Sequence, residues 1–158
     1  MTVEFAAWHT RFANATIDLL EVRYLDGWLD VDDPRKGRRY REGPRSPGPL
    51  STYDLVATLF APDDEQIYRI HYAGVQGFRV LDEGGLLELW EASATQGRPA
   101  STTFRVRGHG WSRESPLTFC FPEDCWSWML ATDWDCLEVV CSVEPFVEPL
   151  EAPEPLAE

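Results

Sequence analysis

The tripeptide Asp133-Trp134-Asp135 is the part of this sequence best suited to chemistry, because it places an aromatic ring between two carboxylates. Residues two apart on an extended chain share a face, so the two acids are able to hold a hard cation such as Mg²⁺ or Ca²⁺. Aspartate is also a favoured turn residue, and no calcium-loop or nuclease spacing surrounds the pair. We therefore expect a solvated turn and no cofactor, with a metal site as the alternative.

Further acidic and aromatic residues precede this tripeptide. Exposed aromatic side chains ringed by acids are typical of a surface that binds a basic protein. Trp126 and Trp128 are two apart on a predicted strand, so their rings are expected on one face. The predicted partner-binding residues are Glu123, Asp124, Trp126, Asp133, Trp134 and Asp135.

The four cysteines, Cys120, Cys125, Cys136 and Cys141, form two pairs with four residues inside each pair. Structural zinc sites often use closer pairs, with two residues between the thiols. Positions five apart on a strand point to opposite faces, so Cys136 and Cys141 are not expected to share a ligand. We expect reduced, buried thiols, and zinc binding is the alternative.

Residues 108–112, Gly-His-Gly-Trp-Ser, place a histidine and a hydroxyl on flexible backbone. The segment lacks the G-x-S-x-G pattern of a nucleophile elbow. The other two histidines, His9 and His71, are far away in the sequence, and no acid stands at a diagnostic spacing from any of the three. A serine or cysteine hydrolase is accordingly not expected, and the two glycines predict a bend or bulge between strands.

The charge of the chain is strongly uneven. The 158 residues carry 14 basic and 27 acidic side chains, which gives a net charge of −13. Residues 34–50 hold six basic groups and one acid, a charge of +5, so the rest of the chain carries −18. This balance excludes broad nucleic-acid binding and attraction to anionic membranes. The segment Arg35–Arg45, with Tyr40 among the arginines, could still bind a phosphate, an RNA or an acidic protein. We expect it to be an exposed loop that keeps the protein in solution.

Short apolar or alternating runs separated by turn residues predict a sheet-rich domain. Three hairpins are expected, from 15–25 with 28–32, from 53–60 with 66–73 and from 126–132 with 136–143. Further strands are expected at 77–81, 102–107 and 117–121, and a short helix at 83–92 with Asp82 as its cap. The run 136–143 is the most apolar and is expected to be central in its sheet.

These elements predict a mainly β, α+β fold, in which antiparallel sheets form a sandwich or a strongly curved sheet with one short helix. A single globular domain is expected over 1–145, including the exposed loop 34–50. Residues 146–158 contain several prolines and glutamates and predict a flexible acidic tail. No secretory leader or membrane-spanning run is seen in the sequence, so a cytoplasmic location is expected.

The segments Phe78–Trp90 and Leu130–Pro145 resemble signatures of small acidic bacterial immunity proteins of polymorphic toxin systems. The resemblance implies a compact, single-domain, non-catalytic protein that neutralises a cognate toxin by covering its active site or an adjacent surface. Together with the negative charge, it favours an inhibitor that binds a basic toxin through an acidic, aromatic-containing surface. The alternative is a small metal- or ligand-binding enzyme, or an accessory subunit.

Overall fold

The computed structural model describes residues 2–24, 55–114, 126–141 and 143–150. Nine strands lie in this part of the chain: β1 (Glu4–Ala7), β2 (Asp18–Tyr24), β3 (Leu55–Ala61), β4 (Gln66–Tyr72), β5 (Val75–Asp82), β6 (Thr103–Arg107), β7 (Ser127–Ala131), β8 (Asp135–Cys141) and β9 (Phe146–Leu150). One α-helix, α1 (Leu87–Gln96), follows a short 3-10 helix, η2 (Glu83–Leu86), and a second 3-10 turn, η3 (Trp111–Arg113), follows β6.

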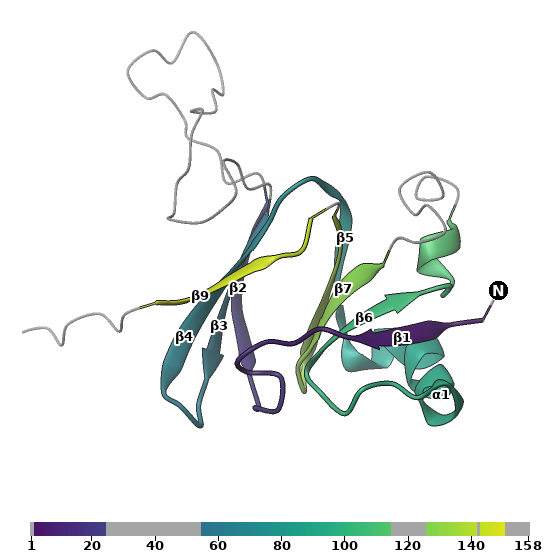
Figure 1. Cartoon of the computed structure of the whole chain (residues 1–158), viewed down its shortest axis with the longest axis horizontal. Helices are drawn as coiled ribbons and strands as arrows, with labels where there is room; N and C mark the ends of the chain where they lie inside the picture. The colour runs from purple at the N-terminus through teal and green to yellow at the C-terminus, as the bar shows by residue number, and fades with distance from the viewer. Residues whose placement is uncertain (1, 25–54, 115–125, 142, 151–158) are drawn as a thin grey trace, which may run out of the picture.

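The strands form two antiparallel sheets. One sheet has the order β1-β6-β7-β8-β5, and the other has the order β2-β3-β4-β9. Figure 1 shows the two sheets side by side with their faces toward each other. Apolar side chains from both sheets fill the space between them, including Leu59 and Ile70 from the four-stranded sheet and Leu137 and Val139 from the five-stranded sheet. The expected antiparallel, sandwich-like fold with one short helix is confirmed.

A helical layer covers the other face of the five-stranded sheet (Figure 1). Leu86 and Leu89 pack there against Phe104, Met129 and Cys136, which point away from the space between the sheets. Successive residues of a strand point to opposite faces, so the five-stranded sheet contributes to two cores. The molecule therefore has three layers in this part of the chain.

Most predicted elements are confirmed within a few residues. The hairpins β3–β4 and β7–β8 form, and β8 is an interior strand that pairs with β7 on one side and β5 on the other. Asp82 caps the helical segment as expected, because its side chain accepts a hydrogen bond from the Gly85 amide at 3.0 Å. The first turn after this cap is a 3-10 helix, at the two glycines that weaken helix formation. Beyond β6, Gly108 has a φ of +77°, which places the expected bend there.

The prediction that the chain stops packing at Pro145 is wrong for residues 146–150. These residues form β9, which pairs with β4 in the register Ile70↔Val147. The physical reason is that Phe146 and Val147 supply enough apolar surface to close the edge of the four-stranded sheet, which the density of prolines and glutamates concealed. The strand β1 was also not expected from the sequence; it pairs with β6.

Several predicted features lie outside the described residues. They are the 28–32 arm of the first hairpin, the loop 34–50, the strand 117–121 and the tail beyond residue 150. Among the described residues, no helix has both the length and the apolar character needed to cross a bilayer.

Candidate functional site

The turn between β7 and β8 holds the acidic tripeptide in a fixed shape. The Thr132 hydroxyl accepts hydrogen bonds from the amides of Trp134 and Asp135, at 3.1 and 3.0 Å, and donates to the Asp135 carbonyl at 2.6 Å. A threonine that satisfies three backbone groups in this way fixes a turn locally. Residue Trp134 is 76% exposed, so the turn presents the indole to solvent.

The end of β5 brings two more acids to this turn. Asp82 stands opposite Asp135 in the β5–β8 register, and the Glu83 amide donates to the Trp134 carbonyl at 3.0 Å. Asp82, Glu83, Asp133, Trp134 and Asp135 are all exposed, and we call this group the Trp134 surface. The predicted turn is thus confirmed, and the structure adds Asp82 and Glu83, whose proximity depends on a pairing between strands more than 50 residues apart.

The four acids of the Trp134 surface have no basic partner among the described residues. Within that part of the chain, no ion pair of 4.0 Å or less joins any of them to an arginine, lysine or histidine. The charges of two of these acids also affect a buried thiol. Burial is the main cause that raises the pKa of the Cys136 thiol to about 11; the hydrogen bond to the Thr132 backbone lowers this pKa, the charges of Glu83 and Asp135 raise it by less, and Arg98 lowers it by less again. As far as the described residues extend, the Trp134 surface is therefore a group of four unpaired carboxylates around one exposed ring.

The remaining predicted partner-binding residues lie away from the Trp134 surface or outside the described residues. Trp126 precedes β7, whereas Asp133 follows it, so about 16 Å of strand separates them. As expected, Trp126 and Trp128 share a face, and both are near Arg105, whose guanidinium carbon is 5.4 and 5.7 Å from their ring centres. Glu123 and Asp124 lie outside the described residues. The Trp134 surface is thus separate from the Trp126 ring.

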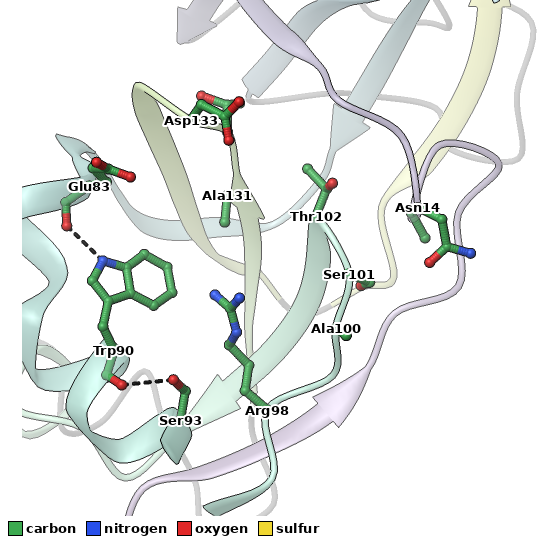
Figure 2. A pocket seen from close by; sticks show the side chains of 12 residues that line it. Asn14, Glu83, Trp90, Ser93, Arg98, Ala100, Ser101, Thr102, Ala131 and Asp133 are labelled. Carbon is green, nitrogen blue, oxygen red and sulfur yellow. Dashed lines mark hydrogen bonds between the residues drawn. The ribbon is translucent and has the colours of Figure 1, made fainter. Parts of the chain in front are cut away.

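A pocket of about 590 Å³ opens beside the Trp134 surface and shares Glu83 and Asp133 with it. Figure 2 shows the indole of Trp90 and the guanidinium of Arg98 in the pocket, with Thr102 across from Trp90. The lining residues come from four segments of the chain and are Ala13, Asn14, Glu83, Trp90, Ser93, Arg98, Ala100, Ser101, Thr102, Ala131, Thr132 and Asp133. Asp133 is the one member of this set that the sequence predicted as a binding residue.

A buried polar cluster lies on the helix-covered side of β8, centred on Glu138. One carboxylate oxygen of Glu138 accepts from Ser127 at 2.6 Å and lies 2.5 Å from Nε2 of His109, and the other accepts from Nε of Arg79 at 2.8 Å. Ser127 and His109 bind the same oxygen and are both fully buried. The arrangement fixes strands and the 108–110 bend to one another. Sequence spacing gave no sign of this pairing, because the histidine and the glutamate come from different elements.

The other residues that the sequence suggested for chemistry take part in backbone hydrogen bonds or in core packing. The Ser112 hydroxyl donates to the backbone carbonyl of His109 at 2.7 Å, and the ring of that histidine faces Glu138 instead. Cys136 lies in the helix-covered core and Cys141 in the core between the sheets, so the expectation that they face opposite ways is confirmed. Across the described ranges, no three His, Cys, Asp or Glu side chains are grouped closely enough to hold a metal ion.

Comparisons of the chain with protein-family models, with curated proteins and with solved structures found no match.

Proposed function

We propose that this protein is a bacterial immunity protein that binds and neutralises a basic toxin through the Trp134 surface. The observation that carries the proposal is a turn, fixed by hydrogen bonds, that holds a tryptophan residue 76% exposed among four carboxylates without a basic partner in the described residues. An exposed tryptophan is costly to keep in water, and its burial in an interface recovers that cost. The sequence resemblance described above supplies the class of partner.

The two kinds of side chain have different tasks in this proposal. The carboxylates attract a cationic surface over a distance and so raise the association rate. The indole fills a pocket on the partner after contact and so lowers the dissociation rate. Backbone hydrogen bonds from Thr132 hold the turn before binding, so little conformational entropy is lost in the complex.

A first experiment identifies the partner and then separates these tasks. The tagged chain is used at low ionic strength to isolate a basic protein that binds in a fixed ratio, is released as salt rises and is toxic when expressed alone. Binding kinetics are then measured for variants. Trp134→Ala should raise the dissociation rate by about 30-fold or more. Asp133→Asn with Asp135→Asn should lower the association rate by about three- to tenfold at low salt and by much less at high salt.

Matched controls come from exposed residues outside the Trp134 surface. Glu114→Gln with Glu144→Gln removes the same number of charges; Glu144 follows the far end of β8, and Glu114 follows η3 beyond the far end of β6. Leu20, in the other sheet and 56% exposed, provides Leu20→Ala as the apolar control. Kinetics and toxin neutralisation that respond equally to both sets of variants, or to neither, would show that the partner binds elsewhere.

A further inference from the structure

Among the described residues that line the pocket, Arg98 has the only positively charged side chain. Its guanidinium carbon lies 4.7 Å from the centre of the Trp90 ring and 5.2 Å from that of Phe104. Among the described residues, it makes no hydrogen bond and no ion pair of 4.0 Å or less. Figure 2 shows the guanidinium directed into the pocket. Arginine carries five N–H donors in a planar fork that matches a carboxylate, and here the aromatic rings fix that fork in place.

The hydroxyl groups around Arg98 already donate their protons to backbone carbonyls. Ser93 donates to the Trp90 carbonyl at 2.7 Å, Thr102 donates to the Ala15 carbonyl at 2.8 Å, and Ser101 donates to the Thr103 carbonyl. A hydroxyl has one proton and two lone pairs, so these three groups face a ligand as acceptors. The Trp90 indole N–H is likewise used, since it donates to the Glu83 carbonyl at 2.7 Å.

The acids of the pocket are separated from its cation. Glu83 and Asp133 contribute carboxylates to the lining, and neither forms an ion pair with Arg98. In Figure 2 both lie on the side of the pocket away from the Arg98 backbone. The described lining of the pocket thus has one cationic donor group, Arg98, at one position and two anionic groups at another. A purely anionic ligand would be repelled by the carboxylates, and a purely cationic one would be repelled by Arg98.

We infer that this pocket binds a zwitterionic ligand whose carboxylate pairs with Arg98 and whose cationic group faces Glu83 and Asp133. A basic amino acid has this chemistry, either as a free molecule or as the C-terminal residue of a peptide. The volume of about 590 Å³ accommodates either form and falls within the usual range of small-molecule pockets. This binding does not depend on the toxin partner, although the pocket and the Trp134 surface share two acids.

The test compares ligands that differ by one group. L-arginine carries both charges, agmatine is the same molecule without the carboxylate, and short acetylated peptides ending in arginine are made with a free carboxylate or with an amide. Binding to the full chain is measured by calorimetry and by the NMR signal of the Trp90 indole N–H. We expect L-arginine or the peptide carboxylate to bind saturably and at least about tenfold more tightly than agmatine or the peptide amide.

Substitutions on the protein provide the second arm. Arg98→Met keeps an apolar stem against Trp90 and should weaken carboxylate binding by about tenfold or more, whereas it should not weaken agmatine binding. Arg105→Met is the matched control, because Arg105 also lies near tryptophan rings but outside the pocket. Thermal melting of each variant checks that it is folded, and the ligand comparison on the unchanged protein stands even if Arg98→Met does not fold.

The outcomes are distinct. Saturable binding of L-arginine supports a free amino acid as the ligand, and binding of the peptide carboxylate alone supports a peptide C-terminus. Equal binding of ligands with and without the carboxylate would show that the acids of the pocket attract any cationic ligand, and would overturn the inference. Absence of binding by all four probes at millimolar concentration would also overturn it, without bearing on toxin binding, which is measured through Trp134.

Discussion

At the scale of single residues, Glu138 shows how a carboxylate remains charged inside this protein. Its side chain is 1% exposed. Burial on its own raises the pKa of this carboxyl, but the hydrogen bond and charge of His109, the charge of Arg79 and the hydrogen bond from Ser127 together hold the pKa below the ordinary value of 4.5. The charged form is therefore the one that the folded protein stabilises.

Replacement of this group should be costly and should change the response to acid. Glu138→Gln leaves His109 and Arg79 without their shared carboxylate, so we expect the free energy of unfolding to fall by about 3 kcal/mol at neutral pH. Since the pKa is lower in the folded than in the unfolded chain, the carboxylate stabilises the fold fully above about pH 4.5, and this contribution is lost as the pH falls through the folded-state pKa.

Urea denaturation at a series of pH values measures both effects. The variant should lose less stability than the natural chain as the pH falls from about 4.5 through the folded-state pKa of Glu138, and the two should respond alike above about pH 5. Glu91→Gln, at an exposed position of α1, serves as the control and should change stability by less than about 0.5 kcal/mol. An equally small effect of Glu138→Gln would mean that the buried cluster contributes nothing to folding.

The residue-scale predictions from sequence succeeded where the contact is local. The Asp133–Asp135 turn and the exposure of Trp134 follow from neighbouring residue types, and both are confirmed. The approach of Asp82 and Glu83 to that turn, and of His109 to Glu138, depends on which strands pair. No periodicity within a segment encodes that choice, so these contacts were not predictable.

At the scale of secondary structure, β9 is the element that the sequence concealed. Its position at the edge of the four-stranded sheet is fixed by Val147, which packs against the core between the sheets, and by Glu148, whose carboxylate lies 2.8 Å from Nε2 of His71. Proline is tolerated at a sheet edge, and Pro149 occupies such a place. Composition alone could not distinguish this edge strand from a solvated tail.

Val147→Ala tests whether β9 contributes to the fold. Loss of two methyl groups from the packed side of the strand should lower the free energy of unfolding by about 1–2 kcal/mol, measured by chemical denaturation. Pro149→Ala changes an exposed position of the same strand and should have an effect below about 0.5 kcal/mol. If residues 146–150 trailed in solvent, the two variants would be equally neutral.

The hairpins and the helix were predictable because their turn residues and alternating runs are adjacent in sequence. Asp82 could be recognised as a cap from its place before an apolar helical pattern. The order β1-β6-β7-β8-β5 was not predictable, since β5 and β8 are joined by a long excursion through α1, β6 and β7. Tertiary packing of both faces of that sheet decides the order.

At the scale of the whole molecule, the net charge of −13 opposes the compact state. The described ion pairs leave many carboxylates uncompensated, including the four of the Trp134 surface. Folding brings these charges closer together than they are in the extended chain. The acidity that would speed encounter with a basic partner is therefore expected to reduce the stability of the free protein.

Added salt should relieve this repulsion. Raising NaCl from about 0.02 M to about 0.5 M should increase the Tm by a few degrees, because the Debye length falls below the spacing of the surface charges. Calorimetry in NaCl and in KCl of equal concentration distinguishes screening, which is the same in both, from binding of one cation. A Tm that falls with salt would show that attractive ion pairs outweigh the repulsion.

The two thiols of β8 give the fold a natural pair of reporters. Cys141 belongs to the core between the two sheets, whereas Cys136 belongs to the core beneath the helix. The two cysteines are five positions apart on one strand. A thiol reagent reaches either sulfur only when the layer that covers it lifts away. Labelling of Cys141 therefore records separation of the two sheets, and labelling of Cys136 records detachment of the helix. The labelling rates of two thiols on one strand thus report separately on the opening of two different layers.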